Sequence, residues 1–305
     1  MRATLSDGDN HEFANYLLKI GEGDESIMEE VNGEPLVPIP PEILSKSKTL
    51  HEFCKEIFPR LRERVESGLK NQCIHDDQEW IDWLMSRAII VPVNEDAYEA
   101  NDLLMKQLSG EEMIYKSADK VLNAKKKQGG NGADPDIVDE LKFPTEYLNS
   151  VNLPSMPPHR LVLKPGAPIM VIRNLDPQNG HANGARYIVK SLHNHVIHAQ
   201  LAIGNHKGKD ILLPRIYFNP QNTPFQFMQR KQFPVKSCFA ITSNKSQAQT
   251  LSKVGIYLKR EFFVHGQLYV AMSRVGSFKD LKVFKPSTNK TVQHMKNVVY
   301  KAILK

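Results

Sequence analysis

Two short apolar segments near the end of the chain alternate with segments that have helical spacing. Cys238–Thr242 (C-F-A-I-T) and Val254–Leu258 (V-G-I-Y-L) have the length and composition of buried strands. Each is followed by a helical pattern, at Ser246–Leu251 (S-Q-A-Q-T-L) and at His265–Val275 (H-G-Q-L-Y-V-A-M-S-R-V). Alternating strands and helices are typical of a parallel sheet covered by helices. The pattern therefore predicts an α/β fold for this region.

The first part of the chain has more of the same signals. Ala88–Asn94 (A-I-I-V-P-V-N) predicts a buried strand, and Asp96–Leu108 predicts the helix that follows it. Glu12–Ile20 has apolar residues at helical spacing, and a further helical pattern runs from about Thr49 to Glu66. The proline-bearing segment Val37–Ile43 predicts a linker.

The middle of the chain changes to short strands separated by glycine and proline turns. The segments are Val162–Leu175, Ala185–Leu192, His195–Ile203 and Asp210–Ile216. Strands of this length and spacing predict a small antiparallel β-barrel. We therefore expect a small barrel inserted into an α/β domain.

Composition limits the class of protein. Hydrophobic residues make up 41% and charged residues 24%, which is typical of a folded protein. The net charge of +6 suits a polyanionic partner but does not require one. Cys54, Cys73 and Cys238 have no paired spacing, so we expect neither disulfides nor a zinc site. No apolar run approaches the ~20 residues of a membrane helix, and we expect a soluble, intracellular protein.

Two segments that resemble binding motifs are interpreted as structural. Gly204–Asp210 (G-N-H-K-G-K-D) lacks the glycine spacing and the hydroxyl residue of a phosphate-binding P-loop, so it predicts a hairpin turn. The pattern G-x-x-x-x-G-K-[ST] occurs nowhere in the sequence. His193 and His195 would share one face of a strand while His198 faces the other, and no neighbouring residue completes a ligand set. We predict no metal site.

The turn within Ala240–Leu251 carries hydroxyls, an amide and a lysine between a strand and a predicted helix. Free N–H groups at a helix start, together with such side chains, suit contact with a phosphate backbone. The alternative is an ordinary helix capped by Ser246.

Arg274 lies beside the apolar stripe of the last predicted helix. That stripe consists of Leu268, Ala271, Met272 and Val275, and Gln267 and Arg274 lie on a neighbouring face. A guanidinium fork there could reach across to a phosphate on another domain. The alternative is a surface salt bridge.

Taken together, Ala240–Leu251 and His265–Val275 resemble motifs V and VI of superfamily-one DNA helicases, specifically the petite-integration-frequency (PIF) family in its Helitron-like form. Gly166–Val189 is similar to the inserted barrel of that family, and the segments P-R-I-Y-F-N-P and Q-F-P-V-K support the match. Ala88–Asp102 resembles its motif IV. The opening M-R-A with Phe13–Gly23 resembles the tail of its motif III.

The resemblance implies a RecA-like parallel-sheet lobe with an inserted small antiparallel β-barrel, preceded by a helical remnant of the first lobe. The expected division is residues 1–60 for the remnant and linker, 61–160 and 236–305 for the two parts of the second lobe, and 161–235 for the barrel.

The resemblance also implies roles for particular residues. Arg274 matches the arginine finger of motif VI, and Arg2 matches a motif III arginine that faces the nucleotide. The expected nucleotide sensors are Gln247 and Gln267, the expected DNA-binding residues are Thr242, Asn244, Lys245 and Ser246, and the expected motif IV residues are Asn94 and Asn101. Two positions depart from the family, since Ala248 replaces a usual glycine and Asn244 replaces a histidine found in many relatives.

The implied function is the C-terminal portion of an ATP-dependent 5′-to-3′ DNA helicase that moves along single strands and unwinds duplexes. Such an enzyme would serve DNA repair, recombination, telomere maintenance or Helitron-type transposition. Its partners would be single-stranded and forked DNA and the first RecA-like lobe, without membrane association or oligomerisation, in the nucleus or alternatively the mitochondrion. Two alternatives are a stand-alone single-stranded nucleic-acid-binding module without motor activity and a decayed transposon remnant.

We predict that the 305 residues alone do not hydrolyse ATP. The family's Walker A lysine and Walker B acids would lie upstream of Met1, so ATP and Mg²⁺ belong to the intact family enzyme and none is bound by this chain alone. Phosphate release by the purified chain with single-stranded DNA should stay at background. Clear turnover that Arg274→Ala abolishes would contradict this expectation.

Overall fold

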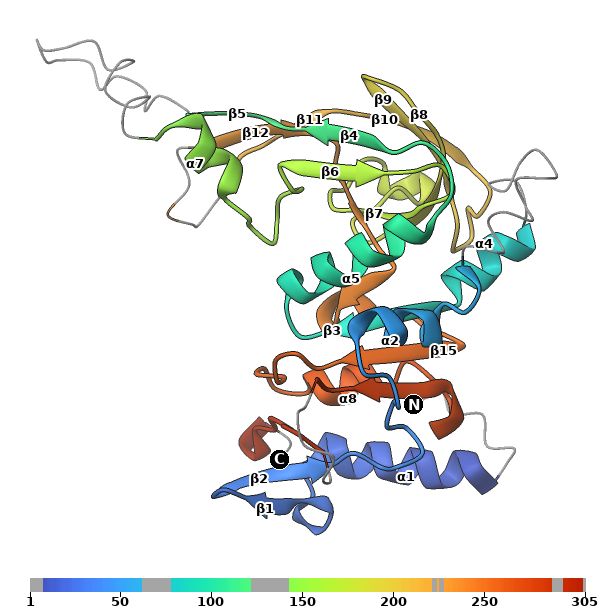
Figure 1. Ribbon diagram of the computed structural model, residues 1–305, viewed down its shortest axis with the longest axis vertical. Helices are drawn as coiled ribbons and strands as arrows, with labels where there is room; N and C mark the ends of the chain where they lie inside the picture. Colours follow the sequence, from blue (N-terminus) through green and yellow to red (C-terminus); the bar gives the residue numbers. More distant parts are fainter. Residues whose placement is uncertain are drawn as a thin grey trace, which may run out of the picture. The chain divides into compact units, whose positions relative to one another are not determined.

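Figure 1 shows the computed structural model of the chain, which divides into two compact units. The structure describes residues 8–61, 78–121, 143–220, 224, 228–286 and 293–303. Unit 1 comprises Met1–Ser109 and Cys238–Lys305, and unit 2 comprises Gly110–Ser237. Unit 2 is therefore an insertion in unit 1, as the sequence indicated, although the compact unit begins at Gly110 whereas the expected barrel begins at residue 161.

Unit 1 contains a four-stranded parallel sheet. Its strand order is β14 (Ala240–Thr242), β3 (Arg87–Val91), β15 (Lys253–Tyr257) and β16 (Leu281–Phe284). Every neighbouring pair is parallel, with Ile241 opposite Ile90 and Ile256 opposite Val283. The α/β fold predicted from strand–helix alternation is confirmed.

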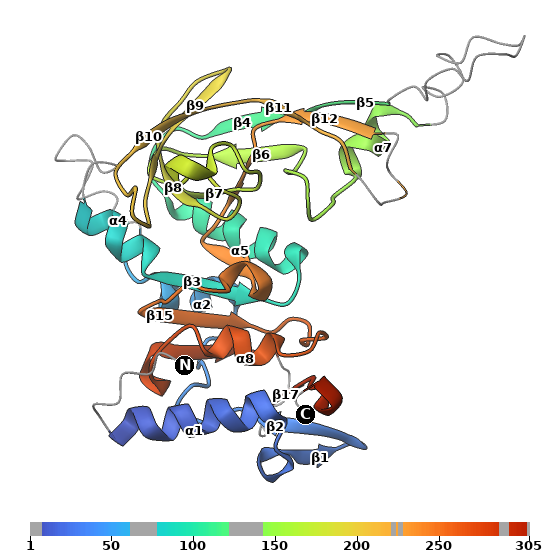
Figure 2. The same ribbon diagram turned by 180° about the vertical axis from the view of Figure 1, so that it is seen from behind.

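Helices cover both faces of this sheet. They are α1 (Gly8–Glu22), α2 (Leu50–Ile57), α4 (Gln78–Met85), α5 (Asn94–Gln107) and α8 (Gln267–Met272). Figures 1 and 2 show α2 and α5 on one face and α8 on the other. Gly255 allows the close approach of α2, because a Cβ there would lie 2.7 Å from Phe53 and 2.6 Å from Ile57.

Helix α1 packs on the outer side of α8. The ring of Phe13 makes an edge contact with Phe278 at 4.8 Å, and Gly21 lies against the ring of Tyr269. Phe278 belongs to the short 3-10 helix η4 (Phe278–Asp280), which precedes β16. The apolar stripe of α1 is therefore buried against the same segment that carries Arg274.

The predicted linker at Val37–Ile43 is wrong in part. Strand β2 (Glu34–Pro38) enters it and pairs with β1 (Glu29–Val31) and with β17 (His294–Met295). Val37, Ile39 and Ile43 are buried. Pro38 is the last residue of β2 and lies opposite His294 of β17. The predicted helices at 12–20 and 96–108 are confirmed as α1 and α5. Of the pattern at 49–66, α2 covers Leu50–Ile57, and residues 62–66 lie outside the described part.

The predicted helix at Ser246–Leu251 is wrong. The 3-10 helix η3 (Ser243–Ser246) ends there, Gln247 is extended, and Ala248 adopts a left-handed backbone with φ of 60°. The N–H of Leu251 donates to the carbonyl of Arg274 at 2.9 Å instead of continuing a helix. The chain then enters β15 directly.

Unit 2 is built mainly from antiparallel strands. A five-stranded sheet has the order β10 (Asp210–Pro214), β9 (Val196–Leu201), β8 (Arg186–Leu192), β7 (Pro168–Val171) and β13 (Val235–Ser237). A second sheet joins β11 (Ile216–Phe218), β12 (Met228–Gln232) and β5 (Ala118–Val121), and β4 (Met113–Lys116) pairs with β6 (Arg160–Leu163). The predicted strands and the hairpin turn at Gly204–Asp210 are confirmed. A closed barrel is not confirmed, because β10 and β13 are the two outer strands of the five-stranded sheet and do not pair with each other.

A buried ion pair holds unit 2 together. The Arg230 side chain and the Asp119 carboxylate are fully buried, with the closest oxygen 2.6 Å from Nη2. The remaining N–H groups of Arg230 donate to three carbonyls between β5 and β6, those of Leu148, Val151 and Pro157. Leu148 belongs to α7 (Thr145–Ser150). One side chain therefore connects β12, β5 and the segment around α7.

Among the described helices, none has the length and apolar composition needed to cross a membrane. Cys54 and Cys238 are buried free thiols, and Cys73 lies outside the described residues.

We predict that Arg230→Ala destabilises unit 2 strongly, because it leaves the Asp119 carboxylate buried without its partner. The expected loss is about 3–5 kcal/mol in the free energy of unfolding, measured by urea unfolding with circular dichroism. Arg160→Ala is the control, since that side chain is 53% exposed and lies 3.8 Å from Glu112. The control should lose less than about 1 kcal/mol, and equal losses would contradict the role given to Arg230.

Candidate functional site

The turn after β14 is fixed by hydroxyl contacts inside unit 1. Ser243 Oγ donates to the carbonyl of Gln267 at 2.9 Å, which ties η3 to the start of α8. Ser246 Oγ donates to the carbonyl of Ser243 at 2.7 Å. Both serines are fully buried. Ser246, expected to bind DNA, therefore has its hydroxyl committed to the turn itself.

The other polar residues of this turn lie on the surface. Asn244, Lys245 and Gln247 are exposed, and Thr242 is half-buried at the end of β14. The side chain of Gln249 donates to the carbonyl of Lys245 at 2.8 Å, which closes the turn. The structure thus presents two of the four predicted DNA-binding residues, Asn244 and Lys245, to solvent, while Thr242 is half-buried and Ser246 is buried.

Arg274 is held at the end of α8 by oxygen atoms of its neighbours. Its Nε donates to the carbonyl of Val270 at 2.7 Å, and Nη2 donates to Ser273 Oγ at 2.8 Å. Its Nη1 donates to the carbonyls of Ser246 at 3.3 Å and Gln249 at 3.2 Å. Since an arginine has five N–H groups, one N–H of Nη2 is left without a partner among the described residues.

The guanidinium charge is not balanced by an acid. In the part of the chain that the structure describes, no carboxylate forms an ion pair with Arg274, and the surface salt bridge considered for it is not present. Burial lowers the pKa of this arginine from its ordinary value. A partly desolvated cation that contacts only neutral oxygens favours an incoming anion, because Coulomb interactions strengthen away from bulk water.

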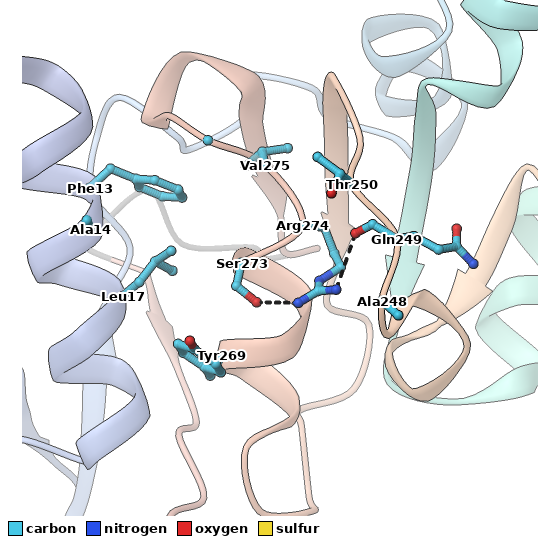
Figure 3. A pocket seen from close by; sticks show the side chains of 11 residues that line it. Phe13, Ala14, Leu17, Ala248, Gln249, Thr250, Tyr269, Ser273, Arg274 and Val275 are labelled. Carbon is cyan, nitrogen blue, oxygen red and sulfur yellow. Dashed lines mark hydrogen bonds between the residues drawn. The ribbon is translucent and has the colours of Figure 1, made fainter. Parts of the chain in front are cut away.

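A pocket of about 400 Å³ lies beside this guanidinium (Figure 3). Phe13, Ala14 and Leu17 of α1 form one wall. The remaining lining residues are Ala248, Gln249, Thr250, Tyr269, Ser273, Arg274, Val275 and Gly276. Sequence reasoning missed the α1 wall. The helical spacing of Phe13, Leu17 and Ile20 indicated a buried face but could not show what it packs against.

Ala248 shapes the part of the turn that holds Arg274. Its φ of 60° lies in the left-handed region, which L-residues other than asparagine and aspartate seldom adopt. Ala248 stands between Ser246 and Gln249, whose carbonyls both accept from Arg274. The position that departs from the family's usual glycine is therefore the one where glycine would be free of strain.

Two other predicted residues have structural contacts. The buried Gln267 side chain accepts the N–H groups of Phe263 and Val264, each at 3.2 Å. The buried Asn101 amide pairs with both backbone groups of Ala240, at 2.8 and 3.0 Å, on the open edge of β14. Both amides stabilise the fold through hydrogen bonds to main-chain groups. Their roles toward nucleotide or DNA stay predictions.

Asn94 is the first residue of α5 and is half-buried, after the carboxyl end of β3. Thr242 pairs with Val91 at the carboxyl end of these two parallel strands. The structure therefore brings Asn94 and the turn after β14 to the same end of the sheet. Arg2 lies outside the described residues.

Comparisons with known proteins point to one family of helicases. The family described as DNA helicase Pif1, 2B domain matches residues 146–192. The ATP-dependent DNA helicase PIF1 of Danio rerio is 31% identical over 202 residues, and that of Mus musculus is 34% identical over 136 residues. The chain resembles the Pif1 helicases over the matched residues.

The match to these Pif1 relatives is partial. It covers 62% of this chain and 26% of the Danio rerio protein, and 40% of this chain and 19% of the Mus musculus protein. The crystal structure of the Pif1 helicase from Candida albicans is similar in fold, with a TM-score of 0.53 and 20% identity over 96% of this chain and 56% of that one. The chain thus spans about a quarter or less of the two curated relatives.

We predict that Ala248→Gly stabilises the chain, because glycine adopts positive φ without the steric cost that Ala248 bears. The unfolding free energy should rise by about 1 kcal/mol in urea titration. Ala118→Gly is the matched control, since Ala118 is an exposed strand residue outside the positive-φ set. That change should lower stability by about 0.5–1 kcal/mol. A loss with Ala248→Gly as well would show that the turn is unstrained.

Proposed function

We propose that this chain is the C-terminal portion of an ATP-dependent DNA helicase, in which it supplies the second RecA-like lobe. The observation that carries the proposal is the Arg274 guanidinium, which borders a pocket, has no carboxylate partner among the described residues and is fixed by the turn after β14. A helicase motor needs such a cation where a phosphate leaves. The similarity to Pif1 helicases supports this interpretation.

On the nucleotide side, Arg274 would contact the terminal phosphate of ATP held mainly by the first lobe. Arg274 suits this contact because one of its N–H groups has no partner among the described residues and no carboxylate there balances its charge. Hydrogen bonds between a guanidinium and a phosphate are charge-assisted. ATP supplies the free energy of the cycle. In the described ranges no three His, Cys, Asp or Glu side chains lie close enough to hold a metal ion, so we assign no residue of this chain to Mg²⁺.

On the DNA side, the exposed Asn244 and Lys245 with Thr242 would contact the phosphate backbone of a single strand. These residues share one turn with the carbonyls of Ser246 and Gln249 that hold Arg274. A shift of the turn on DNA would therefore move the guanidinium directly. This gives a short mechanical path between DNA binding and phosphate release.

The finer assignments also belong to this proposal. Residues 161–235 would correspond to the small inserted domain of the family. The intact enzyme would move 5′-to-3′ along single strands and unwind forked DNA. It would act as a monomer in the nucleus or the mitochondrion. The pathway, whether repair, recombination, telomere maintenance or transposition, is inferred from the family alone.

We predict that Lys245→Gln weakens binding of the 305-residue chain to fluorescein-labelled single-stranded DNA. Removing one phosphate contact should reduce the slope of log K against log salt concentration by about 0.7, measured by fluorescence anisotropy. Lys259→Gln is the control in the same unit, because Lys259 pairs with Glu99 at 2.7 Å. An unchanged slope with Lys245→Gln, or an equal change with Lys259→Gln, would contradict the assigned DNA contact.

A further inference from the structure

One face of the sheet β11-β12-β5 in unit 2 carries polar side chains around an exposed ring. Tyr217 pairs with Lys231, and Gln229 pairs with Lys120, so these side chains share that face. We call this face the Tyr217 platform, which consists of Ala118, Lys120, Tyr217, Asn219, Gln229 and Lys231. The alternate residues of the same strands, among them Phe218, Met228 and Arg230, are buried. The platform therefore faces away from the core of unit 2.

The ring of Tyr217 is exposed to solvent, and two ammonium groups lie over it. The residue is 57% exposed. Lys231 Nζ lies 5.2 Å and Lys120 Nζ 5.9 Å from the ring centre. Gln229 Nε2 donates to Asn219 Oδ1 at 2.9 Å, which gives the platform an ordered polar edge. None of its six residues is acidic, so its charge is +2 from the two lysines.

The charge of the chain is concentrated in the unit that carries this platform. Gly110–Ser237 contains 17 Lys and Arg against 10 Asp and Glu, a net charge of +7. The whole chain has +6, so the remaining residues carry a net −1. A polyanion approaching the protein is therefore attracted to unit 2.

We propose that the Tyr217 platform binds single-stranded DNA, with one base stacked on Tyr217 and the adjacent phosphates on Lys120 and Lys231. An exposed aromatic ring beside basic side chains suits unpaired bases, because every base has a face that can stack. Duplex DNA keeps its bases stacked inside the helix, so it could use the lysines but not the ring. This surface goes beyond the proposed function, from which it takes only the choice of DNA over RNA.

The stacking part of the proposal is tested with two labelled oligomers of equal length, oligodeoxythymidylate and its abasic analogue. Tyr217→Ser should weaken binding of the thymidylate oligomer by roughly 5- to 150-fold, whereas Tyr217→Phe should retain it. Both variants should bind the abasic oligomer as the unchanged protein does. Equal unfolding midpoints by circular dichroism exclude a folding defect at this exposed position.

The charge part is tested with two double variants of equal net charge. Lys120→Gln with Lys231→Gln should reduce the salt slope by about 0.7 per lysine. Lys207→Gln with Lys209→Gln, in the turn between β9 and β10, should leave the slope nearly unchanged. An equal effect of both pairs would show that only the overall charge matters and would overturn the assigned contacts.

Other outcomes separate this proposal from the DNA contact of the turn after β14. If Lys245→Gln weakens binding and Tyr217→Ser does not, the platform is rejected and the turn contact stands. The reverse result supports the platform and rejects the turn contact. Tighter binding of an oligouridylate through Tyr217 would overturn the choice of DNA, and no binding by the unchanged chain would overturn both contacts.

Discussion

The hydrogen bonds from Arg274 to main-chain carbonyls are the contacts on which the functional interpretation depends. Main-chain carbonyls cannot ionise, so they orient the guanidinium without neutralising it. Two of them belong to the turn after β14 and one to α8 itself. The cation is thus fixed in direction while its charge remains available, the arrangement that electrostatic stabilisation of a leaving phosphate requires.

The parallel sheet explains how these groups come together. The turn leaves the carboxyl end of β14, follows the inner side of α8, and reaches the start of β15, where Leu251 bonds to the carbonyl of Arg274. Asn101 closes the outer edge of β14, and Ser243 ties the turn to α8. In the proposed function, a displacement of the exposed end of this turn would reach the arginine through few covalent and hydrogen bonds. Ala248 adopts a backbone conformation in this turn that glycine would adopt without strain.

The sequence predicted the elements whose pattern is local. Apolar runs located the buried strands, and Leu268, Ala271 and Met272 located the buried face of α8. The helix is shorter than the expected span of His265–Val275, because α8 covers only Gln267–Met272. The turn after β14 was mistaken for a helix, because its course depends on a left-handed residue at Ala248 and on a bond from Leu251 to a residue of another element. Neither leaves a periodic signal in the sequence. The pair of Arg230 and Asp119 is 111 residues apart, so no local pattern could identify it.

The site residues differ in how far the structure agrees with their expected surroundings. Arg274 lies beside a pocket and Lys245 lies on the surface, and their expected roles toward nucleotide and DNA stay predictions. Asn101 and Gln267 were expected near ligands, but their amides satisfy backbone groups inside the fold. An amide can serve either purpose, and only the surrounding backbone decides which. The α1 wall of the pocket could not be predicted, because helical spacing indicates a buried face but not what that face packs against.

The most direct measurement is ATP hydrolysis by a chimera in which this chain replaces the matching region of the Danio rerio relative. In a chimera that hydrolyses ATP with single-stranded DNA, Arg274→Ala should lower kcat by about 10³-fold or more, and Arg274→Lys should not restore it because an ammonium cannot keep the carbonyl contacts. Arg260→Ala, which removes an exposed partner of Glu95, should leave kcat unchanged. An Arg274→Ala chimera with the parent rate would contradict the assignment of this guanidinium to the nucleotide.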